Sequence, residues 1–348
     1  MPRTEIVTVN NFLGFEEIAV TASFHHAARS FTMRIAAEMG PIATAWGFKA
    51  GTEIIIASTG DPIFTGYVDR YQPRNRKHEQ AHIIVSGRTR GQDFIDSSAV
   101  HKTNQFKNKT PVEIAQELDR WGVIWSDQQL DKVPVYRITP GETCFRCAEK
   151  LIREQGLFAV GQADGRIKIT KAGQRRQAGP LIEGVNIEES EADHNWSGRH
   201  SDIIVRGQQP YGHGEDALQI EQIAKDAKLG RYRPIIVIHD GDTDNKRAKK
   251  RAQTRRDREA GNALRATITA VGHHDDSGEL WEPGNLVYVE SPFLAIQQDM
   301  AIEQCVYRQD RDGGTLTDIT VADPAALGGK GQQGGSAGDA WSTGAGND

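Results

Sequence analysis

Three groups of side chains in this sequence have types and spacings that could support metal or redox chemistry. Cys144 and Cys147 have the C-x-x-C spacing, which in other settings exchanges disulfides or binds zinc. They lie inside a predicted helix, with no second cysteine pair and no βαβ pattern around them. We therefore favour a buried structural role for both thiols.

Asp240, Asp242 and Asp244 are spaced like the first ligands of a calcium-binding loop. Such a loop has glycine at its sixth position and glutamate at its twelfth, whereas this sequence has Asn245 and Arg251 there. We interpret Asp244 as the N-cap of the following helix, and the other two as solvated loop carboxylates.

The run His273-His274-Asp275-Asp276 contains four side chains of types that bind metal ions. It directly precedes Ser277-Gly278, a turn signal, in a predicted hairpin. Because metal ligands are usually held in place by surrounding structure, we favour a solvated turn here.

Gly329, Gly331 and Gly334 match the dinucleotide-binding pattern G-x-G-x-x-G, but no predicted strand precedes them and no helix follows. No stretch brings together a nucleophile, a base and an orienting partner, and the P-loop motif is missing. We therefore predict a protein that is not an enzyme, with no catalytic, cofactor-binding or metal-binding residues.

A predicted helix from about 244 to 260 is strongly basic and could bind nucleic acid. Asp257 and Glu259 interrupt the positive charge, and small residues at 248, 252, 260 and 263 form a narrow stripe for packing on a barrel. A solvated face, or one that meets an acidic partner, is the interpretation we favour. The basic residues are Lys246, Arg247, Lys249, Lys250, Arg251, Arg255, Arg256, Arg258 and Arg265.

The composition is that of an ordinary soluble protein. The chain has 348 residues, 37% of them hydrophobic and 26% charged, and its net charge of −5 gives no general attraction to nucleic acid. Three cysteines argue against a disulfide framework. No apolar run is long enough to cross a membrane, so we expect no membrane insertion and synthesis in the cytoplasm.

The elements that carry these side chains include an internal repeat. Phe48–Ser58 and Trp281–Ser291 both begin with an aromatic residue, have glycine three places on and end in serine, at an offset of 284 − 51 = 233 residues. Ser30–Ala37 corresponds in the same way to Leu264–Val271, and 64–72 corresponds to 299–307. The repeat predicts two copies of one supersecondary unit.

These patterns divide the chain into four parts and predict a mainly β fold. Residues 1–97 show about six short strands, and we expect a first β-barrel domain. Residues 181–325 hold the second copy and the basic helix, and we expect a second, similar barrel. The Gly-rich residues 326–348 cannot bury enough apolar surface to fold, so we expect a flexible tail.

Residues 98–180 change to helical spacing and predict an α+β insertion. Thr110, Pro111 and Glu113 form a capping-box pattern that begins a helix over about 111–121. A second helix is predicted from Thr143 to a stop at Gly156, followed by a hairpin over 157–169.

Several stretches, taken together, resemble the baseplate hub protein of Mu-like contractile-tailed phages. They run in consistent order from about residue 5 to 322, although the Gly-rich ending departs from the longer, more charged ending of that family. The stretches are Thr65–Asp69, Val85–Arg88, Asp93–Val100, Lys107–Thr110 leading into Ile114-Ala115, and Arg231–Val237 before the basic helix.

The resemblance implies a virion tail protein, similar in architecture to the hub part of type VI secretion spikes. It implies a homotrimer with pseudo-six-fold symmetry that joins the hexameric tail tube protein to the trimeric central spike protein, with other baseplate or wedge proteins as further partners. DNA would pass through the channel without specific binding, and the ring would be assembled in the bacterial host cytoplasm. Two alternatives remain, a tail-tip enzyme that degrades cell wall and a nucleic-acid-binding module that uses the basic helix.

Overall fold

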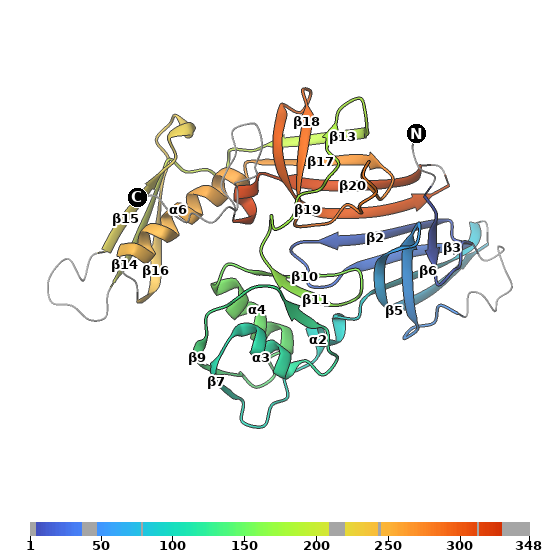
Figure 1. The fold of residues 1–348 in the computed structure, drawn as a ribbon, viewed down its shortest axis with the longest axis horizontal. Coiled ribbons are helices and arrows are strands. Elements are labelled where there is room, and N and C mark those ends of the chain that lie inside the picture. Colours follow the sequence, from blue (N-terminus) through green and yellow to red (C-terminus); the bar gives the residue numbers. More distant parts are fainter. Residues whose placement is uncertain are drawn as a thin grey trace. The chain divides into compact units, whose positions relative to one another are not determined.

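Figure 1 shows a computed structural model of the chain, which is mainly β with few helices. The structure describes residues 5–36, 47–77, 79–208, 220–242, 245–311 and 313–328. The chain divides into two compact units. Unit 1 comprises Met1–Glu189, Ile268–Val287 and Ile302–Thr320, and unit 2 comprises the rest.

The first copy of the repeat forms six strands, the number predicted for this part of the chain. Short runs of β-branched and aromatic residues alternate between buried and exposed positions, as in β2 and β3, and therefore form strands with one face in the core. In sheet order these are β1 (Val7–Val9), β4 (Glu53–Ser58), β5 (Asp61–Arg76), β6 (Glu79–Thr89), β3 (Ser30–Ala36) and β2 (Glu17–Ser23).

The second copy has its strands in the same order. They are β12 (Leu181–Ile182), β18 (Leu286–Ser291), β19 (Ile296–Asp310), β20 (Gly314–Ala322), β17 (Leu264–Val271) and β13 (Ile187–His194). Each strand of the first copy thus has a counterpart at the same place in the second.

The two copies do not form two separate barrels. β2, the last strand of the first copy, pairs antiparallel with β19, from Glu17 opposite Asp310 to Ser23 opposite Gln304 (Figure 1). All twelve strands therefore belong to one sheet, and no closed barrel is found among the described residues. The expectation of two barrels within the chain is not met, because β2 uses its free edge to bind the other copy and does not return to β1.

The equivalence of Gly51 and Gly284 is confirmed by their hydrogen bonds. The N–H of Gly51 donates to the carbonyl of Val68 over 2.7 Å, and that of Gly284 donates to the carbonyl of Ile302 over 2.8 Å. Their φ angles are +86° and +90°, a region that favours glycine. The same turn therefore precedes β4 and β18.

The residues after the first copy, where an α+β insertion over 98–180 was expected, form three helices and five short strands that belong to unit 1 together with the first copy. The helices are α2 (Gln92–Asp96), α3 (Pro111–Leu118) and α4 (Cys144–Glu154). The strands are β7 (Gln105–Lys109), β8 (Ile124–Ser126), β9 (Val133–Arg137), β10 (Phe158–Gly161) and β11 (Ile167–Thr170). The capping box at Thr110 and Glu113 and the hairpin of β10 with β11 are confirmed, whereas α2 was not predicted.

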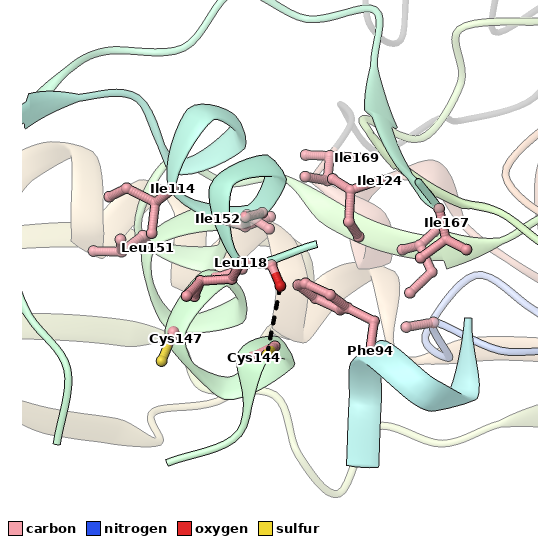
Figure 2. Packing of buried hydrophobic residues seen from close by; sticks show 14 of the residues in the cluster. Phe94, Ile114, Leu118, Ile124, Cys144, Cys147, Leu151, Ile152, Ile167 and Ile169 are labelled. Atoms are coloured by element: carbon pink, nitrogen blue, oxygen red, sulfur yellow. Dashed lines mark hydrogen bonds between the residues drawn. The ribbon is translucent and has the colours of Figure 1, made fainter. Parts of the chain in front are cut away.

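One hydrophobic cluster fills the centre of the insertion. Figure 2 shows Ile114 and Leu118 of α3 facing Leu151 and Ile152 of α4, with Phe94 of α2 beside them. All five side chains are at most 5% exposed. The helical spacing of these residues is what turns one face of each helix toward the cluster.

Residues 202–261, which lie in unit 2, form a small layer of their own. β14 (Asp202–Gln208) pairs with β15 (Ile220–Lys225) and β16 (Pro234–Asp242), and α6 (Asn245–Gly261) packs on β14 and β15 (Figure 1). Ala248 and Ala252 are buried against this sheet. The small-residue stripe was therefore recognised correctly, but it packs on a separate three-stranded sheet and not on a barrel.

Two short 3-10 helices complete unit 2, η1 (Ala227–Leu229) and η2 (Pro324–Leu327). η2 extends past the predicted start of the tail, because Leu327 is 3% exposed and Gly328, at φ +91°, ends the helix. Residues 329–348 of the expected tail lie outside the described residues.

Candidate functional site

The junction between the two copies is made of backbone pairing and buried side chains. Val20 and Ala22 of β2 are fully buried, and Tyr307, opposite Val20 on β19, is 1% exposed. A sheet edge that binds another strand supplies main-chain hydrogen bonds as well as apolar contact. β2 and the second half of β19 therefore form a strand-to-strand interface inside one chain.

Arg29 connects this junction to the insertion. This residue is 1% exposed, and its side chain donates from Nε to the carbonyl of Gly161 over 3.1 Å and from Nη1 to the carbonyl of Ile63 over 3.1 Å. Nη2 lies 2.5 Å from Oε2 of Glu282, in the turn before β18. Burial alone would lower the pKa of Arg29, but the charge of Glu282 contributes to a net increase. Sequence reasoning missed Arg29, because nothing around it marks a buried charge.

The His273 run is not a solvated turn, and that prediction was wrong. His273 is 1% exposed and Asp275 is 7% exposed. The backbone N–H of His273 donates to Oε2 of Glu5 over 2.7 Å, and Nδ1 of His274 lies 3.0 Å from Oε1 of the same carboxylate. Nε2 of His274 also lies 3.1 Å from Oδ2 of Asp61. The turn itself is present, but residues far away in the sequence cover its first part.

The pKa values in this cluster follow from those contacts. Burial alone would raise the pKa of Glu5, but hydrogen bonds from His274 and from the His273 backbone lower it to about 2. Burial lowers the pKa of His273, whereas the hydrogen bond to Glu5 raises the pKa of His274. The cluster therefore favours an ionised Glu5 beside a protonated His274 and a neutral His273.

Ser58, His273 and Glu5 have the residue types of a catalytic triad. Ser58 Oγ lies 3.0 Å from Nδ1 of His273 and 3.1 Å from Oε2 of Glu5. However, Ser58 is fully buried, and the other imidazole nitrogen faces the carbonyl of Arg308 at 3.3 Å. A substrate cannot reach this hydroxyl, so the geometry supports a structural contact that attaches the N-terminal segment to the second copy.

Asp275 attaches the end of the insertion to the same turn. Its carboxylate accepts hydrogen bonds from the backbone N–H of Gly179 over 2.8 Å and from Nε2 of Gln177 over 3.1 Å. Burial raises the pKa of Asp275, but these bonds and those from Ser277 and Glu279 give a net decrease. The side chain is held as an acceptor of local hydrogen bonds.

Cys144 and Cys147 are placed as predicted, inside the hydrophobic cluster of the insertion (Figure 2). They are 2% and 0% exposed, and both are free thiols. Burial raises the pKa of each, to about 11 for Cys147. Both are therefore protonated at neutral pH, which supports the structural role.

The remaining sequence motifs supply no site among the described residues. The side chains of Asp240, Asp242 and Asp244 and the glycines at 329, 331 and 334 lie outside that part of the chain. In the described residues no group of three or more His, Cys, Asp or Glu side chains could hold a metal ion. Sequence reasoning also overlooked the run from His78 to His82, which matches the zinc-protease pattern H-E-x-x-H. That pattern requires a helix, whereas β6 begins at Glu79.

Part of the positive charge of α6 is paired. Nε of Arg255 lies 2.9 Å from Oε1 of Glu259, whose other oxygen lies 3.0 Å from Nδ1 of His200. Arg256 binds Asp257 over 2.7 Å. These pairs agree with the interpretation of α6 as a packed helix with a solvated, charged face.

The other face of the small sheet in unit 2 is apolar and exposed. Ile223, Ile236 and Ile238 are 48%, 51% and 69% exposed, and Ile204 lies between Ile223 and Ile236 in the strand register. Large exposed apolar patches are uncommon on soluble proteins and usually mark interaction surfaces. This face is thus a candidate contact surface of unit 2.

In the described part of the chain, no helix is both long and apolar enough to cross a membrane.

Three protein-family models match successive parts of the chain. Residues 6–89 match the Mu phage baseplate assembly protein GpP-like N-terminal domain. Residues 91–171 match the second domain of the baseplate hub protein gp44-like family. Residues 244–329 match the fourth domain of the Mu phage baseplate assembly protein GpP.

Comparison with individual proteins gives the same result. The chain is 26% identical over 331 residues to the baseplate hub protein gp44 of Escherichia phage Mu, a match that covers 89% of this chain and 85% of that protein. Its fold is similar to that of the 43 kDa tail protein of prophage MuSo2 from Shewanella oneidensis, with a TM-score of 0.79, 24% identity and coverage of 93% and 99% of the two chains. It is also similar, with a TM-score of 0.53 and 9% identity, to the E. coli type VI secretion component c3393, over 90% of this chain and 76% of that one.

Proposed function

The chain belongs to the family of Mu-like phage baseplate hub proteins, and from this we propose that three copies of it form a ring at the tail tip that joins the hexameric tail tube to the trimeric central spike. The three chains of the ring are related by three-fold symmetry. The six copies of the repeat, two from each chain, are related by pseudo-six-fold symmetry. A chain that carries two copies of one unit can match a six-fold partner on one side and a three-fold partner on the other.

The observation that carries this proposal is the identical strand order of the two copies, joined at their edges by β2 and β19. Three such chains contain six equivalent strand sets. If each copy of the repeat pairs with the next copy as β2 pairs with β19, the sheets of the three chains join edge to edge. The joined sheet closes where the third chain pairs with the first. The barrel that is missing within one chain then belongs to the trimer, around a central channel.

The proposed partners follow from this arrangement. They are the tail tube protein, the central spike protein and other baseplate or wedge proteins, and DNA passes through the channel without specific binding. The ring is assembled in the host cytoplasm before it becomes part of the virion tail. The buried state of Ser58 and the two C-x-x-C thiols supports a role in assembly and not in catalysis.

Three measurements test the function. The native mass of the purified chain, together with an image of the tail tip, should give three copies per ring. One or two copies per tail would contradict the proposal. In a cell-wall clearing assay the purified chain should leave the polymer intact, and clear lysis would instead support the tail-tip enzyme. For the basic helix, binding to nucleic acid should disappear between low and physiological salt.

A further inference from the structure

The junction inside the chain has two halves, and each has a counterpart elsewhere in the repeat. One half is β2 of the first copy, whose counterpart in the second copy is β13. The other is Gln304–Asp310 of β19, which binds β2. Ile302 corresponds to Val68 by the hydrogen bonds of the two glycine turns, at an offset of 302 − 68 = 234. Residues 304–310 therefore correspond to 70–76, the second half of β5.

The counterpart of β2 is a sheet edge. β13 is the last strand in the sheet order, and β17 is its neighbour; no strand of the described part of the chain pairs with its other side. Four of its eight residues are acidic, in the sequence IEESEADH. All four acidic side chains are exposed: Glu188, Glu189, Glu191 and Asp193.

Residues 70–76 of β5, which correspond to Gln304–Asp310 of β19, also have a sheet edge that no described strand pairs with. β4 pairs with β5 only from Asp61 to Tyr67, and beyond that point no described strand lies on this side of β5. The open segment, RYQPRNR, carries three arginines and no acidic residue. Arg70 and Arg74 are exposed. Pro73 fits an edge, because proline in sheets is largely confined to edge strands.

The two open edges thus carry opposite charge. The junction inside the chain has no such pattern: β2 reads EIAVTAS, and β19 reads QCVYRQD over the paired segment. Charged side chains on an edge strand prevent indiscriminate pairing, since like edges repel one another. A strongly acidic edge and a strongly basic edge reject copies of themselves but attract each other.

We propose that β13 of one chain pairs antiparallel with residues 70–76 of β5 in a second copy of this chain. This interface rests on the proposed function, because it is the contact that would close the ring. It is heterologous, so each chain offers one acidic and one basic edge, and the junctions between chains alternate with the β2–β19 junctions inside them.

Charge reversal on the full-length chain tests the proposal. The acidic edge is reversed in Glu189→Arg/Glu191→Arg and the basic edge in Arg70→Glu/Arg74→Glu. A matched control, Lys102→Glu/Lys107→Glu, changes the same number of exposed charges on the insertion. Native mass is measured over a range of concentrations, and circular dichroism and the unfolding midpoint check that each variant is folded.

Each edge variant should have the mass of one chain, whereas the wild type and the control should have the mass of three. The variant that carries both reversals should recover the trimer, because the two edges again have opposite charge. In hydrogen exchange, backbone amides of 190–193 and 70–75 should be protected in the trimer and exchange faster in the single-edge variants.

The outcomes separate the two proposals. A wild-type trimer whose edge variants also remain trimers, or whose combined variant stays monomeric, overturns the edge pairing and leaves the ring in place. Equal exchange at both edges in trimer and monomer also overturns the pairing. A wild-type chain that stays single at every concentration counts against the ring itself.

Discussion

Nη2 of Arg29 lies 2.5 Å from Oε2 of Glu282, although 253 residues separate them in the sequence. The arginine follows β2 in the first copy, and the glutamate precedes β18 in the second. The side chain of Arg29 is 2% exposed and that of Glu282 is 30% exposed. The pair therefore holds the two copies together from inside the fold.

Replacing Arg29 should strongly lower the stability of the fold. Arg29→Met removes the charge while keeping most of the volume, and it leaves Glu282 and two backbone carbonyls without their donor. We expect the free energy of unfolding to fall by about 3–5 kcal/mol, measured by urea denaturation. Arg175→Met is the control, because Arg175 and Glu279 form an ion pair in which both side chains are exposed. Its loss should lower the free energy of unfolding by less than about 1 kcal/mol. Equal losses in the two variants would contradict the prediction.

Ionisation of Glu5 should make the free energy of unfolding depend on pH in the acid range. Its pKa is about 2 in the folded chain against an ordinary value of 4.5, so its ionised form stabilises the fold above pH 4.5. That contribution, about 3 kcal/mol, should be lost as the pH falls from 4.5 to 2. In Glu5→Gln the side chain is neutral throughout. The difference in unfolding free energy between wild type and variant should therefore shrink over this range, and a constant difference would show that Glu5 is not the titrating group.

Gly51 and Gly284 offer a matched pair of substitutions. Both have positive φ, so alanine should cost about 1 kcal/mol at each for backbone strain. At Gly284 the added Cβ would also lie 2.6 Å from two ring carbons of Phe24, whereas no described atom lies within 4 Å at Gly51. We expect Gly284→Ala to cost about 2 kcal/mol more than Gly51→Ala in thermal or urea unfolding. A smaller loss for Gly284→Ala would contradict this packing.

The three cysteines should be unreactive in the folded chain. Cys144, Cys147 and Cys305 are all buried and free, and burial raises the pKa of each thiol. A thiol reagent at pH 8 should label none of them until denaturant is added, when all three should react. Rapid labelling of Cys144 or Cys147 in the folded chain would contradict the buried structural role and support a redox role for the C-x-x-C pair.

Local signals in the sequence predicted much of the fold. The capping box at Thr110 was recognised because its residues lie within four positions of one another. The glycine turn at Gly51 was recognised because its form recurs at Gly284. Such features depend on nearby residues, so a single sequence contains the information needed to find them.

The features that were missed depend on residues far apart in the chain. His273 looked solvated because its covering residue, Glu5, lies 268 positions away. β13 gives only a weak strand signal in the sequence, since its acidic residues have low strand propensity and its hydrogen-bonding partner is β17. The union of the two copies in one sheet could not be predicted from patterns within either copy.

The pairing of β2 with β19 also sets an order of events during synthesis. Ser23 of β2 cannot pair with Gln304 until the ribosome has added that residue, 304 − 23 = 281 residues later. At about 5–20 residues per second this delay is roughly 15–60 s. During that time the apolar edge of β2 is available to other nascent chains, whereas β13 emerges with its own row of negative charge. The N-terminal strands should therefore be the part of this chain most dependent on chaperones, and a truncation before β19 should yield aggregates rather than a folded first copy.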